Sequence, residues 1–485
     1  MPENPPGSVR LKRREFLELV GGGTLSLVYG CSSDSSEPDA SNCTPVAAAG
    51  APDRPNVLFV SIDDLNDWIG VLGGHPQALT PNIDRLAARG VLFSNAHCNA
   101  PVCKPSRTSV ISGLRPTTTG LYRNDQDGFR RFYPDLVTLP QYFMRNGYRT
   151  VGGGKILDDP DPASWEEYWP GRNKIRGSDP EPGGRPANGL ADVGNLDWGS
   201  LPETATPMGD QRLLSKWAVP NLQRGCLEQP FFMAVGIYKP HLPWYLPTES
   251  FAPFPPESTV LPEVLAGDRD DLPRAALRLL GSDDHQQIVD AGVWPDGVAA
   301  YLAAVYFADQ IVGDLMAALQ ASAYADNTIV VLWSDNGFHL GEKERWRKQT
   351  LWHESTRVPL IFSVPGNLNA GATCVRPVSL LDIYPTLLEL CELPPRDDLE
   401  GASLVPLLED PNADWSLPAV STRDIGTHAV ISEEWRYIRY GNGNEELYDL
   451  SVDRNDWTNL AARSELASVK ADLAAWLPAI EAPAP

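Results

Sequence analysis

The chain has 485 residues, enough for two or more domains, and its 42% hydrophobic content with 14 Trp and 15 Tyr is typical of a globular protein. Its 40 basic and 63 acidic residues give a net charge of -23, which argues against nucleic acid as a partner because the surface would repel a phosphate backbone. An anionic substrate would have to be drawn in by local positive charge. No apolar run outside the N-terminus is long enough to span a bilayer, so no transmembrane helix is expected in the mature protein.

The N-terminus predicts export from the cytoplasm. Arg13-Arg14, followed by a short and weakly hydrophobic stretch, resembles a twin-arginine signal, and the sequence VYGC ending at Cys31 resembles a bacterial lipobox. We therefore expect residues 1–31 to be an export signal and residues 32–53 to be a disordered tether. Lipid on Cys31 is the one expected route to membrane attachment, and a plain cleaved signal with an incidental Cys is the alternative. Either way, the mature protein is expected in the periplasm or at the cell surface.

From about Arg54 onward, strand-like apolar runs alternate with helical patterns. A helix is expected to begin at Thr80-Pro81, since Pro is favoured in the first turn, and to end before Gly90. The expected strands are 56–62, 231–235, 328–333 and 358–364, and the other expected helices are 139–146, 211–222, 298–320 and 380–390. This alternation predicts an α/β fold with a mostly parallel sheet sandwiched by helices, whose chemistry gathers at the carboxyl ends of the strands.

Two regions depart from this alternation. Residues 158–206 are rich in Pro, Gly and Asp and lack periodicity, so a long surface excursion is expected there. Beyond about residue 400, short antiparallel strands are expected over 429–440 and 446–450, followed by a helix over 466–476. We therefore predict a catalytic domain over residues 54–395 and a smaller C-terminal α+β subdomain over residues 396–485.

Oxygen ligands follow two of the predicted strands. Asp63 and Asp64 end the sequence FVSIDD, and Asp335 and Asn336 follow VVLWS far along the chain. Taken singly, such pairs are most often turns or helix caps. Together, at the carboxyl ends of parallel strands, they can converge on one hard cation such as Ca²⁺. Neither His nor Cys stands beside either pair in the sequence, which disfavours zinc.

The seven cysteines show no C-x-x-C spacing, and buried free thiols are expected at Cys226, Cys374 and Cys391. Cys103 is different, because Pro105 and Arg107 follow it in a C-x-P-x-R pattern. This short pattern also fits an ordinary Cys at the junction of a loop and a helix. It resembles the modification signature of type I sulfatases, in which the Cys is oxidised to formylglycine, an aldehyde that becomes the nucleophile.

With the acidic pairs added, the chain resembles the type I sulfatases of the alkaline phosphatase superfamily from about Pro55 to the C-terminal subdomain. The iduronate 2-sulfatases and their bacterial relatives are the most similar group. The resemblance implies an alkaline-phosphatase-like fold and a formylglycine at position 103 made by a formylglycine-generating enzyme. It also implies that Arg107 supports this residue, and that calcium is bound by the residues Asp63, Asp64, Cys103, Asp335 and Asn336.

Three cationic positions follow from the same resemblance. The segment GGGKILDD implies that Lys155 is the first active-site Lys, IYKPHLPW implies that His241 binds the sulfate, and GEKERWRKQTLW implies that Lys348 is the second Lys. A sulfate ester needs cationic donors on its equatorial oxygens and a donor at the leaving oxygen. Singly, each of the three would be read as a surface charge or a satisfied loop His.

In the family, hydrated formylglycine, polarised by Ca²⁺, attacks the sulfur in line and the sugar hydroxyl leaves. A second hydroxyl on the same carbon then loses its proton, which releases sulfate and restores the aldehyde. The family usually places a His two or three residues after the first Lys to assist this last step, but this chain has Asp158 there. A carboxylate is a weak base at neutral pH unless its pKa is raised, and His97 or His353 could reach the site instead.

A sulfated carbohydrate, such as a 2-O-sulfated uronate, is the expected substrate. Two basic clusters could select an anionic sugar or could be solvated loop charges: Arg123, Arg130 and Arg131, and Arg172, Lys174 and Arg176. A phosphonate monoester or phosphodiester hydrolase of the same superfamily is one alternative. A non-catalytic protein that binds sulfated glycans is the other, and Asp158 is the feature that favours it.

Overall fold

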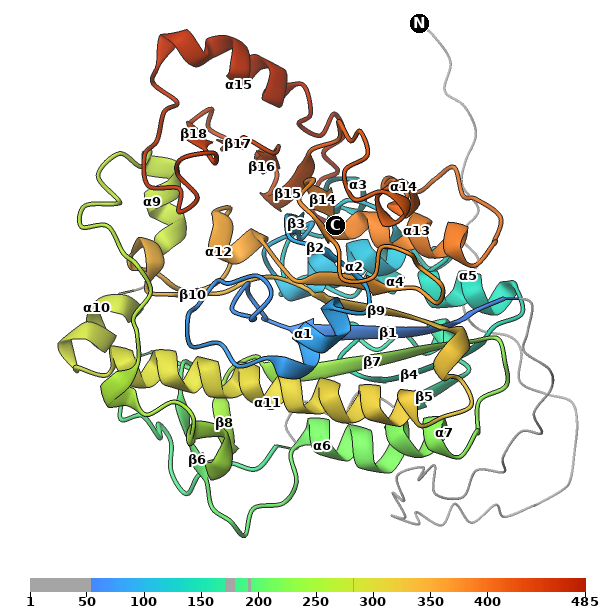
Figure 1. Cartoon of the computed structure of the whole chain (residues 1–485). Helices are drawn as coiled ribbons and strands as arrows, with labels where there is room; N and C mark the ends of the chain where they lie inside the picture. Colours follow the sequence, from blue (N-terminus) through green and yellow to red (C-terminus); the bar gives the residue numbers. More distant parts are fainter. Residues whose placement is uncertain (1–53, 171–178, 191–192, 282) are drawn as a thin grey trace, which may run out of the picture. The chain divides into compact units, whose positions relative to one another are not determined.

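The computed structural model describes residues 54–170, 179–190, 193–281 and 283–485, all within one compact unit, Glu37–Pro485 (Figure 1). The predicted export signal, the tether and Cys31 lie outside the described residues. The basic cluster Arg172, Lys174 and Arg176 lies outside them as well.

An eight-stranded sheet forms the centre of this unit, with strand order β13-β2-β12-β9-β1-β7-β4-β5. Its strands are β1 (Asn56–Asp63), β2 (Val91–Phe93), β4 (Arg149–Gly154), β5 (Glu167–Trp169), β7 (Phe231–Pro240), β9 (Thr328–Ser334), β12 (Leu360–Ser363) and β13 (Thr373–Cys374). The run β9-β1-β7-β4-β5 is parallel throughout, whereas β12 is antiparallel to both β9 and β2. The predicted mostly parallel sheet is confirmed.

Helices cover both faces of this sheet, which Figure 1 shows nearly edge-on. On one face lie α11 (Trp294–Gln320), α1 (Pro81–Ala87), α6 (Gly209–Leu213) and α7 (Val219–Gln223); on the other lie α2 (Cys103–Ser112), α5 (Leu139–Arg145) and α13 (Ile383–Leu390). Alternate residues of β1 enter the two cores: Leu58 and Val60 pack on the α11 side, and Val57 and Phe59 on the α2 side. A continuous apolar run was needed here because β1 is buried on both faces.

The longest helix, α11, is apolar enough to cross a membrane by length and composition. In this protein 67% of its most apolar window is buried, and it packs against β7 and α1. It is therefore a core helix. The helix predicted over 211–222 is interrupted, because a π-helical turn, η3 (Leu214–Ala218), separates α6 from α7.

The predicted excursion over 158–206 is more structured than its composition indicated. It supplies β5 to the edge of the central sheet and β6 (Trp198–Leu201), which pairs with β8 (Trp244–Pro247). Trp165, Trp169 and Leu196 from this segment are buried in the two cores. The expectation of a surface excursion was therefore wrong for these parts, since isolated Trp and Leu residues provide burial without periodicity.

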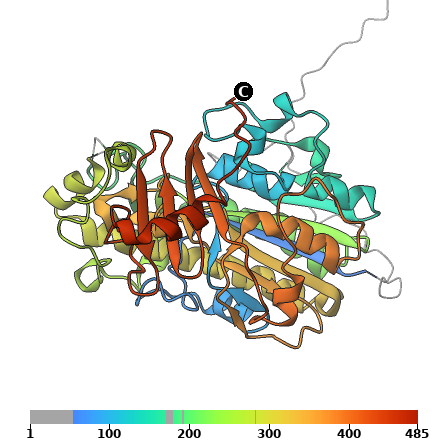
Figure 2. The same ribbon diagram turned by 90° about the horizontal axis from the view of Figure 1, so that it is seen from above.

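The C-terminal segment forms a four-stranded antiparallel sheet in the order β15-β16-β17-β18, with α15 lying across it (Figure 2). The elements are β15 (Ala419–Asp424), β16 (Thr427–Ile431), β17 (Trp435–Arg439), β18 (Glu445–Asp449) and α15 (Ala467–Ala474). The strands expected over 429–440 and 446–450 and the helix expected over 466–476 are confirmed, and β15 was missed. The domain boundary near residue 395 stays a prediction.

The remaining elements are short. They are β3 (Ala96–His97), β10 (His339–Leu340), β11 (Trp346–Arg347), β14 (Val378–Ser379), α3 (Pro116–Thr119), α4 (Phe129–Phe132), α8 (Thr248–Phe251), α9 (Arg274–Leu280), α10 (Asp284–Asp290), α12 (His353–Thr356), α14 (Val405–Glu409) and the 3-10 helices η2 (Pro162–Ser164), η4 (Pro256–Ser258), η5 (Ala325–Asn327), η6 (Glu342–Glu344), η7 (Leu380–Asp382) and η8 (Ser464–Leu466). Cys374 and Cys391 are buried free thiols as expected, whereas Cys226 is half-buried and disulfide-bonded, so that expectation was wrong.

Candidate active site

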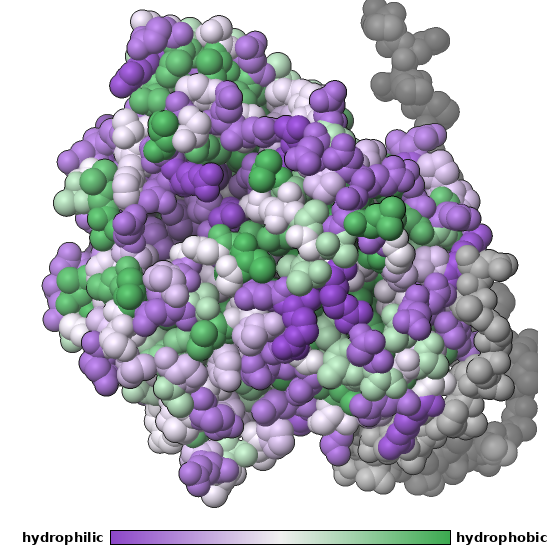
Figure 3. Space-filling model, viewed as in Figure 1, coloured by the Kyte–Doolittle hydropathy of each residue, from purple (hydrophilic) through white to green (hydrophobic). Residues whose placement is uncertain are grey.

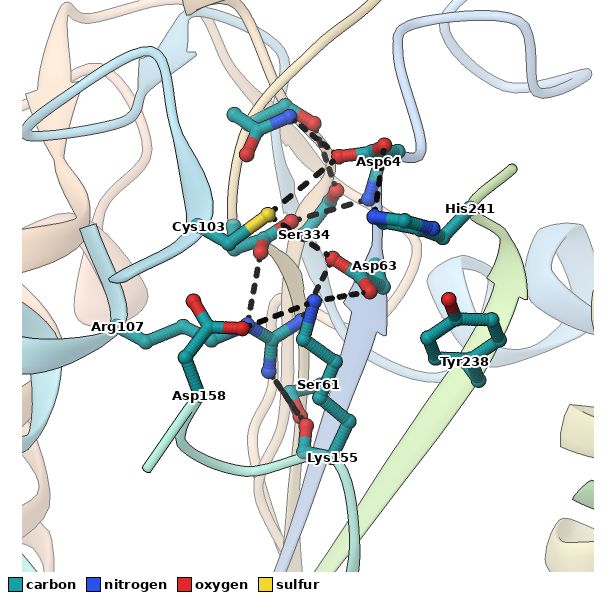
Figure 4. Close-up of polar contacts among 12 residues, drawn as sticks. Ser61, Asp63, Asp64, Cys103, Arg107, Lys155, Asp158, Tyr238, His241 and Ser334 are labelled. Carbon is teal, nitrogen blue, oxygen red and sulfur yellow. Dashed lines mark hydrogen bonds and ion pairs between the residues drawn. The ribbon is translucent and has the colours of Figure 1, made fainter. Parts of the chain in front are cut away.

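Four adjacent parallel strands end at the same edge of the sheet, and each is followed directly by polar residues singled out in the sequence (Figure 4). Strand β1 leads into the Asp63-Asp64 pair and β9 into the Asp335-Asn336 pair; β7 leads into His241 and β4 into Lys155. Cys103 joins them from the first turn of α2, and Lys348 from the loop after β11. The fold therefore brings together every residue proposed for the site.

The acidic residues form a buried cluster with Cys103. One ligand atom from each of Asp63, Asp64, Cys103 and Asp335 lies within 4.8 Å of the others. The positive φ of Asp64, 61°, turns the chain directly after β1 and lets two successive carboxylates enter one site. The Asp64 amide donates to Asp335 Oδ1 at 3.0 Å, and Asn336 Nδ2 donates to Asp64 Oδ1 at 2.8 Å.

The donor set fits a hard metal ion. Oδ1 of Asn336 is buried and accepts no hydrogen bond from a described residue, which leaves it free as a ligand. Three carboxylates and one amide oxygen are the ligands that Ca²⁺ prefers. The sequence disfavoured zinc because neither His nor Cys stands beside the acidic pairs. In the fold, however, ligand atoms of His241 and Cys103 do lie within 4.8 Å of Asp63, so zinc is less strongly disfavoured.

Arg107 contacts two of the clustered carboxylates and the backbone at Lys155. Its fully buried guanidinium donates through Nε to Asp335 Oδ2 at 2.7 Å, lies 3.4 Å from Asp63 Oδ1, and donates through Nη1 to the Lys155 carbonyl at 2.5 Å. Although burial opposes its charge, Asp335 and Asp63 raise the pKa of Arg107 further above its ordinary value. One fixed cation thus orients groups from three strand ends.

Asp63 and Asp335 differ in how readily their carboxyl groups ionise. Burial opposes the charge of Asp63, but Lys155 and the other nearby cations hold its pKa well below the usual range. Burial raises the pKa of Asp335 to about 7; Arg107 opposes this rise and the charges of Asp63 and Asp64 add to it. Burial thus works against full ionisation of the cluster, and a bound cation would favour it.

Cys103 is the first residue of α2, where the helix dipole favours a negative charge. Its Sγ lies 2.8 Å from Lys348 Nζ and 3.5 Å from Asp63 Oδ1. Burial nevertheless raises the pKa of the thiol well above its ordinary value, against the opposing charges of Lys155 and Lys348. An unmodified Cys103 is therefore a protonated, poorly nucleophilic thiol at neutral pH.

Lys155 reaches the site because β4 and β7 approach closely at their ends. Gly154 has φ 82°, and a Cβ there would lie 2.0 Å from the carbonyl oxygen of Gly236, so only glycine fits. The Lys155 amide donates to that carbonyl at 3.0 Å. Its Nζ then donates to Asp63 Oδ2 at 2.5 Å, and Asp63 raises the pKa of Lys155 despite burial.

Lys348 is held by a loop of unusual backbone geometry. The residues on either side of it, Arg347 and Gln349, have φ values of 76° and 74°. Such conformations persist in non-glycine residues only where surrounding contacts impose them. Here Arg347 Nε donates to Asp284 at 2.8 Å, the Gln349 amide donates to the Pro101 carbonyl at 3.0 Å, and Lys343 forms a buried ion pair with Asp268 at 2.7 Å.

His241 presents a defined nitrogen to the site. Its Nδ1 lies 2.6 Å from the Leu242 carbonyl and must be the donor, so Nε2 points to the acids, 3.9 Å from Asp64 Oδ2. Burial lowers the pKa of His241 to about 4, although Asp63 and Asp64 act in the opposite direction. The imidazole is therefore neutral until an anion approaches.

Asp158 faces the site, but the two other candidates for the missing base do not. Its side chain is 6% exposed and lies 3.2 Å from Lys155 Nζ, and neither of its oxygens accepts a hydrogen bond from a described residue. Burial opposes its charge, yet Lys155 lowers its pKa below the ordinary value. His97 instead contacts Asn95, and His353 pairs with Asp67.

Sequence reasoning missed two residues that support the site. The Tyr301 hydroxyl, on α11, donates to the Asp64 carbonyl at 2.8 Å and accepts from the Asn66 amide at 3.0 Å. The centroid of the Tyr238 ring lies 4.8 Å from the centroid of the His241 ring. The same Tyr238 centroid lies 5.7 Å from Lys155 Nζ. The one signal in the sequence for Tyr301 was a Tyr inside the apolar run that forms α11. Its hydrogen bond to Asp64 joins residues far apart in the chain, so the sequence alone could not indicate it.

Each arginine of the described basic cluster after the Cys103 motif has a carboxylate neighbour. Arg130 binds Asp161 at 2.9 Å and Arg123 pairs with Asp125 at 3.2 Å. Arg131 pairs with Asp127. The pairs of Arg123 and Arg131 are exposed and therefore weak, so the interpretation as an anion-selecting cluster stays a prediction.

Comparison with known proteins gives consistent matches along the chain. A family model described as Sulfatase matches residues 55–393, and one described as N-sulphoglucosamine sulphohydrolase, C-terminal, matches residues 341–482. The chain is 38% identical over 446 residues to a protein named Sulfatase from Formosa agariphila, covering 88% of this chain and 87% of that protein. It is 33% identical over 404 residues to iduronate 2-sulfatase of Homo sapiens, covering 71% of this chain and 70% of that protein.

Solved structures show the same fold at lower identity. The phosphonate monoester hydrolase of Agrobacterium radiobacter superposes with a TM-score of 0.69 at 23% identity, covering 87% of this chain and 94% of that chain. At this identity the likeness concerns the fold alone.

Proposed function

Because the chain belongs to the sulfatase family, has its alkaline-phosphatase-like fold and is a sulfuric ester hydrolase, we propose that it desulfates a carbohydrate such as a 2-O-sulfated uronate, using formylglycine at position 103 and bound calcium. The observation that carries this proposal is the surroundings of the Cys103 side chain. Two lysines, a neutral His and three buried carboxylates converge on one point at the end of the sheet.

The chemistry of position 103 supports its modification. A thiol with a raised pKa has little nucleophilic thiolate, so a buried Cys gains nothing from this position unless it is converted. A formylglycine there, hydrated by addition of water to its aldehyde, would supply a hydroxyl nucleophile in place of Sγ. Lys348, 2.8 Å from that atom, and Asp63, 3.5 Å from it, would then orient the hydroxyl and its lone pairs.

The metal site is proposed from the same residues. Asp63, Asp64, Asp335 and Asn336 would hold calcium, together with the group at position 103, and the ion would supply Lewis-acid stabilisation of negative charge. Arg107 keeps these ligands in place whether or not the ion is bound, because its contacts to Asp63 and Asp335 lie within the buried core.

The cationic side chains serve the substrate. Lys155 and Lys348 provide ammonium donors for the sulfuryl oxygens. An incoming sulfate ester would raise the pKa of His241, since a nearby anion favours the charged imidazole, and Nε2 would then donate to the leaving sugar oxygen. The Leu242 carbonyl fixes the ring for this role by accepting from Nδ1.

Asp158 would take the place of the family His. It is a buried carboxylate without a hydrogen-bond donor, next to Lys155, so it is positioned to accept a proton during release of the product. Its lowered pKa makes it a weak base at neutral pH. We therefore propose that this proton transfer limits turnover.

Two further proposals come from the sequence. The protein acts after export, in the periplasm or at the cell surface, with attachment through a lipidated Cys31 as the possible membrane contact. It also depends on a formylglycine-generating enzyme of its host before or during export. The twin-arginine signal supports this order, because that route carries folded proteins.

The test is a paired substrate assay on protein made with formylglycine-generating machinery. Sulfate release from 2-O-sulfated uronate disaccharides is compared with hydrolysis of a phosphonate monoester under the same conditions. Preference for the sulfated sugar supports the proposal. Preference for the phosphonate would transfer it to the other enzyme class of the superfamily, and binding of the sugar without any turnover would favour a glycan-binding protein.

A further inference from the structure

A second cavity lies between the central α/β layers and the C-terminal sheet. Its volume is 480 Å³, within the range of small-molecule sites, and no residue assigned above to the active site lines it. Its wall includes residues of the loop after β1, the segment around α12 and the loop after β18. In Figure 3 a hollow with hydrophilic walls lies beneath the C-terminal strands, near α12.

Three guanidinium groups line this cavity, from Arg357, Arg436 and Arg454, against the single carboxylate of Glu433. Most of these charges have partners. Arg357 and His353 share Asp67, at 2.7 and 3.2 Å, and Arg436 pairs with Asp456 at 3.0 Å. Arg376, from outside the cavity wall, pairs with Glu433, which leaves that carboxylate neutralised.

Arg454 is the exception on this wall. Its exposed side chain makes no ion pair or hydrogen bond with any residue in the part of the chain that the structure describes. A second donor is also unsatisfied, because Nη2 of the fully buried Arg436 has no acceptor among the described residues. This nitrogen is also shielded from solvent, so the exposed guanidinium of Arg454 is the group that a ligand in the cavity could reach.

The rest of the wall has the character of a sugar site. Asn95, whose Oδ1 contacts His97, offers its side-chain nitrogen, and Leu72 and Leu450 offer apolar surface that suits the C–H face of a pyranose ring. In a chain with a net charge of -23, the unpaired charge of Arg454 gives this wall a local attraction for anions. Arg is also the side chain whose planar fork best matches a carboxylate or sulfate.

We propose that this cavity binds an anionic sugar unit, bearing a carboxylate or a sulfate, as a polysaccharide site separate from the active site. The inference rests on the proposed function, since it takes the substrate to be an acidic glycan. Arg454 supplies the free guanidinium that pairs with the anionic group. Inorganic sulfate offers the same chemistry without the sugar, and the experiment separates the two.

The test is titration calorimetry on the full chain carrying Cys103→Ala, which prevents turnover, with a 2-O-sulfated uronate disaccharide and, separately, inorganic sulfate. Two disaccharides are expected per chain. Adding Arg454→Gln should lower the affinity of one of the two sites for the disaccharide by about tenfold or more, because a charge-assisted hydrogen bond is lost. Adding Arg463→Gln, an exposed Arg of the same subdomain away from the cavity, should leave both sites unchanged.

Three results would overturn the inference: binding of a single disaccharide per chain that Arg454→Gln leaves unchanged, two sites that are insensitive to Arg454→Gln, or an Arg454-dependent site filled by inorganic sulfate but not by the disaccharide. Measurements of turnover distinguish failure of this inference from failure of the proposed function. With Cys103 restored, Arg454→Gln should keep kcat and KM on a small aryl sulfate and raise KM on a sulfated polysaccharide. Absence of all turnover, with Arg454-dependent binding intact, would reject the proposed function and leave the sugar site standing.

Discussion

The carboxylate of Asp158 lies 3.2 Å from the ammonium of Lys155, yet neither of its oxygens accepts a hydrogen bond from a described residue. The pair is buried, and Lys155 lowers the pKa of Asp158 against the effect of burial. The position thus holds a carboxylate that is charged and weakly basic at neutral pH, beside Lys155.

Asp158→His is therefore expected to raise kcat on a sulfate ester by about tenfold to a hundredfold, because a base with a pKa near neutrality replaces a weak one. Steady-state kcat and its pH profile measure the effect. Asp158→Asn is the matched control: it removes the charge and the base together and should lower kcat. Equal rates in all three proteins would show that Asp158 takes no part in the limiting proton transfer.

Position 103 is expected to carry an aldehyde when the protein is made with formylglycine-generating machinery, as mass spectrometry of the peptide spanning it would show. Cys103→Ala should then reduce kcat by about 10³-fold or more, since the nucleophile is lost. Cys374→Ala, at a buried free thiol on the edge strand β13, serves as the control for folding and modification. An unmodified thiol in fully active protein would reject the assignment.

Lys348→Met is expected to reduce kcat by about 10² to 10³, the usual cost of losing one charged donor at a developing anion. Lys216→Met, at an exposed Lys on η3, should have no effect.

Since the loop around Lys348 is held by the buried ion pair of Lys343 and Asp268, Asp268→Asn should also lower kcat while leaving KM for a small substrate nearly unchanged. A loss confined to thermal stability would show that this ion pair has no part in positioning Lys348.

Calcium should stabilise the protein, by about 2.7 kcal/mol at one hundred times its dissociation constant. The metal must meet ionised ligands, and burial raises the pKa of Asp335 to about 7. Below that pH a proton has to leave Asp335 when calcium binds, so the affinity should weaken as the pH falls from 8 to 6. Thermal unfolding with calcium or zinc after chelation measures this, and Asn336→Ala should reduce the calcium shift. Stabilisation by zinc alone would contradict the oxygen-ligand assignment.

Acid should destabilise the protein partly through Asp67. Burial opposes its charge, but His353 and Arg357 lower its pKa from 3.8 to about 2. The folded state then binds fewer protons than the unfolded state between these values, so this stabilisation is present above pH 4 and is lost as the pH falls to 2. It amounts to about 2 kcal/mol.

Asp67→Asn should therefore flatten the pH dependence of the free energy of unfolding between pH 5 and 2, measured by urea denaturation. It should also lower the stability at pH 7, where Arg357 is left without its partner. Asp326→Asn, at an exposed carboxylate, is the control. An unchanged acid limb in the Asp67 variant would disprove the linkage.

The sequence alone predicted four of the eight strands of the central sheet, β1, β7, β9 and β12, together with the alternating α/β order, and the family resemblance supplied the proposed site residues. This was possible because β1, β7 and β9 are buried on both faces and so read as continuous apolar runs, and because parallel strands place their carboxyl ends together. The cysteine motif and the two acidic pairs are local in sequence and needed no structure to be recognised.

Only the tertiary structure decided how those residues act on one another. Gly154 and Gly236 bring Lys155 to Asp63 through a close approach of two strands, and Tyr301 fixes Asp64 from a helix 237 residues away along the chain. The charge state of Asp158 likewise depends on its burial beside Lys155. Contacts, burial and pKa values are properties of side chains brought together from distant positions, and no local pattern in the sequence encodes them.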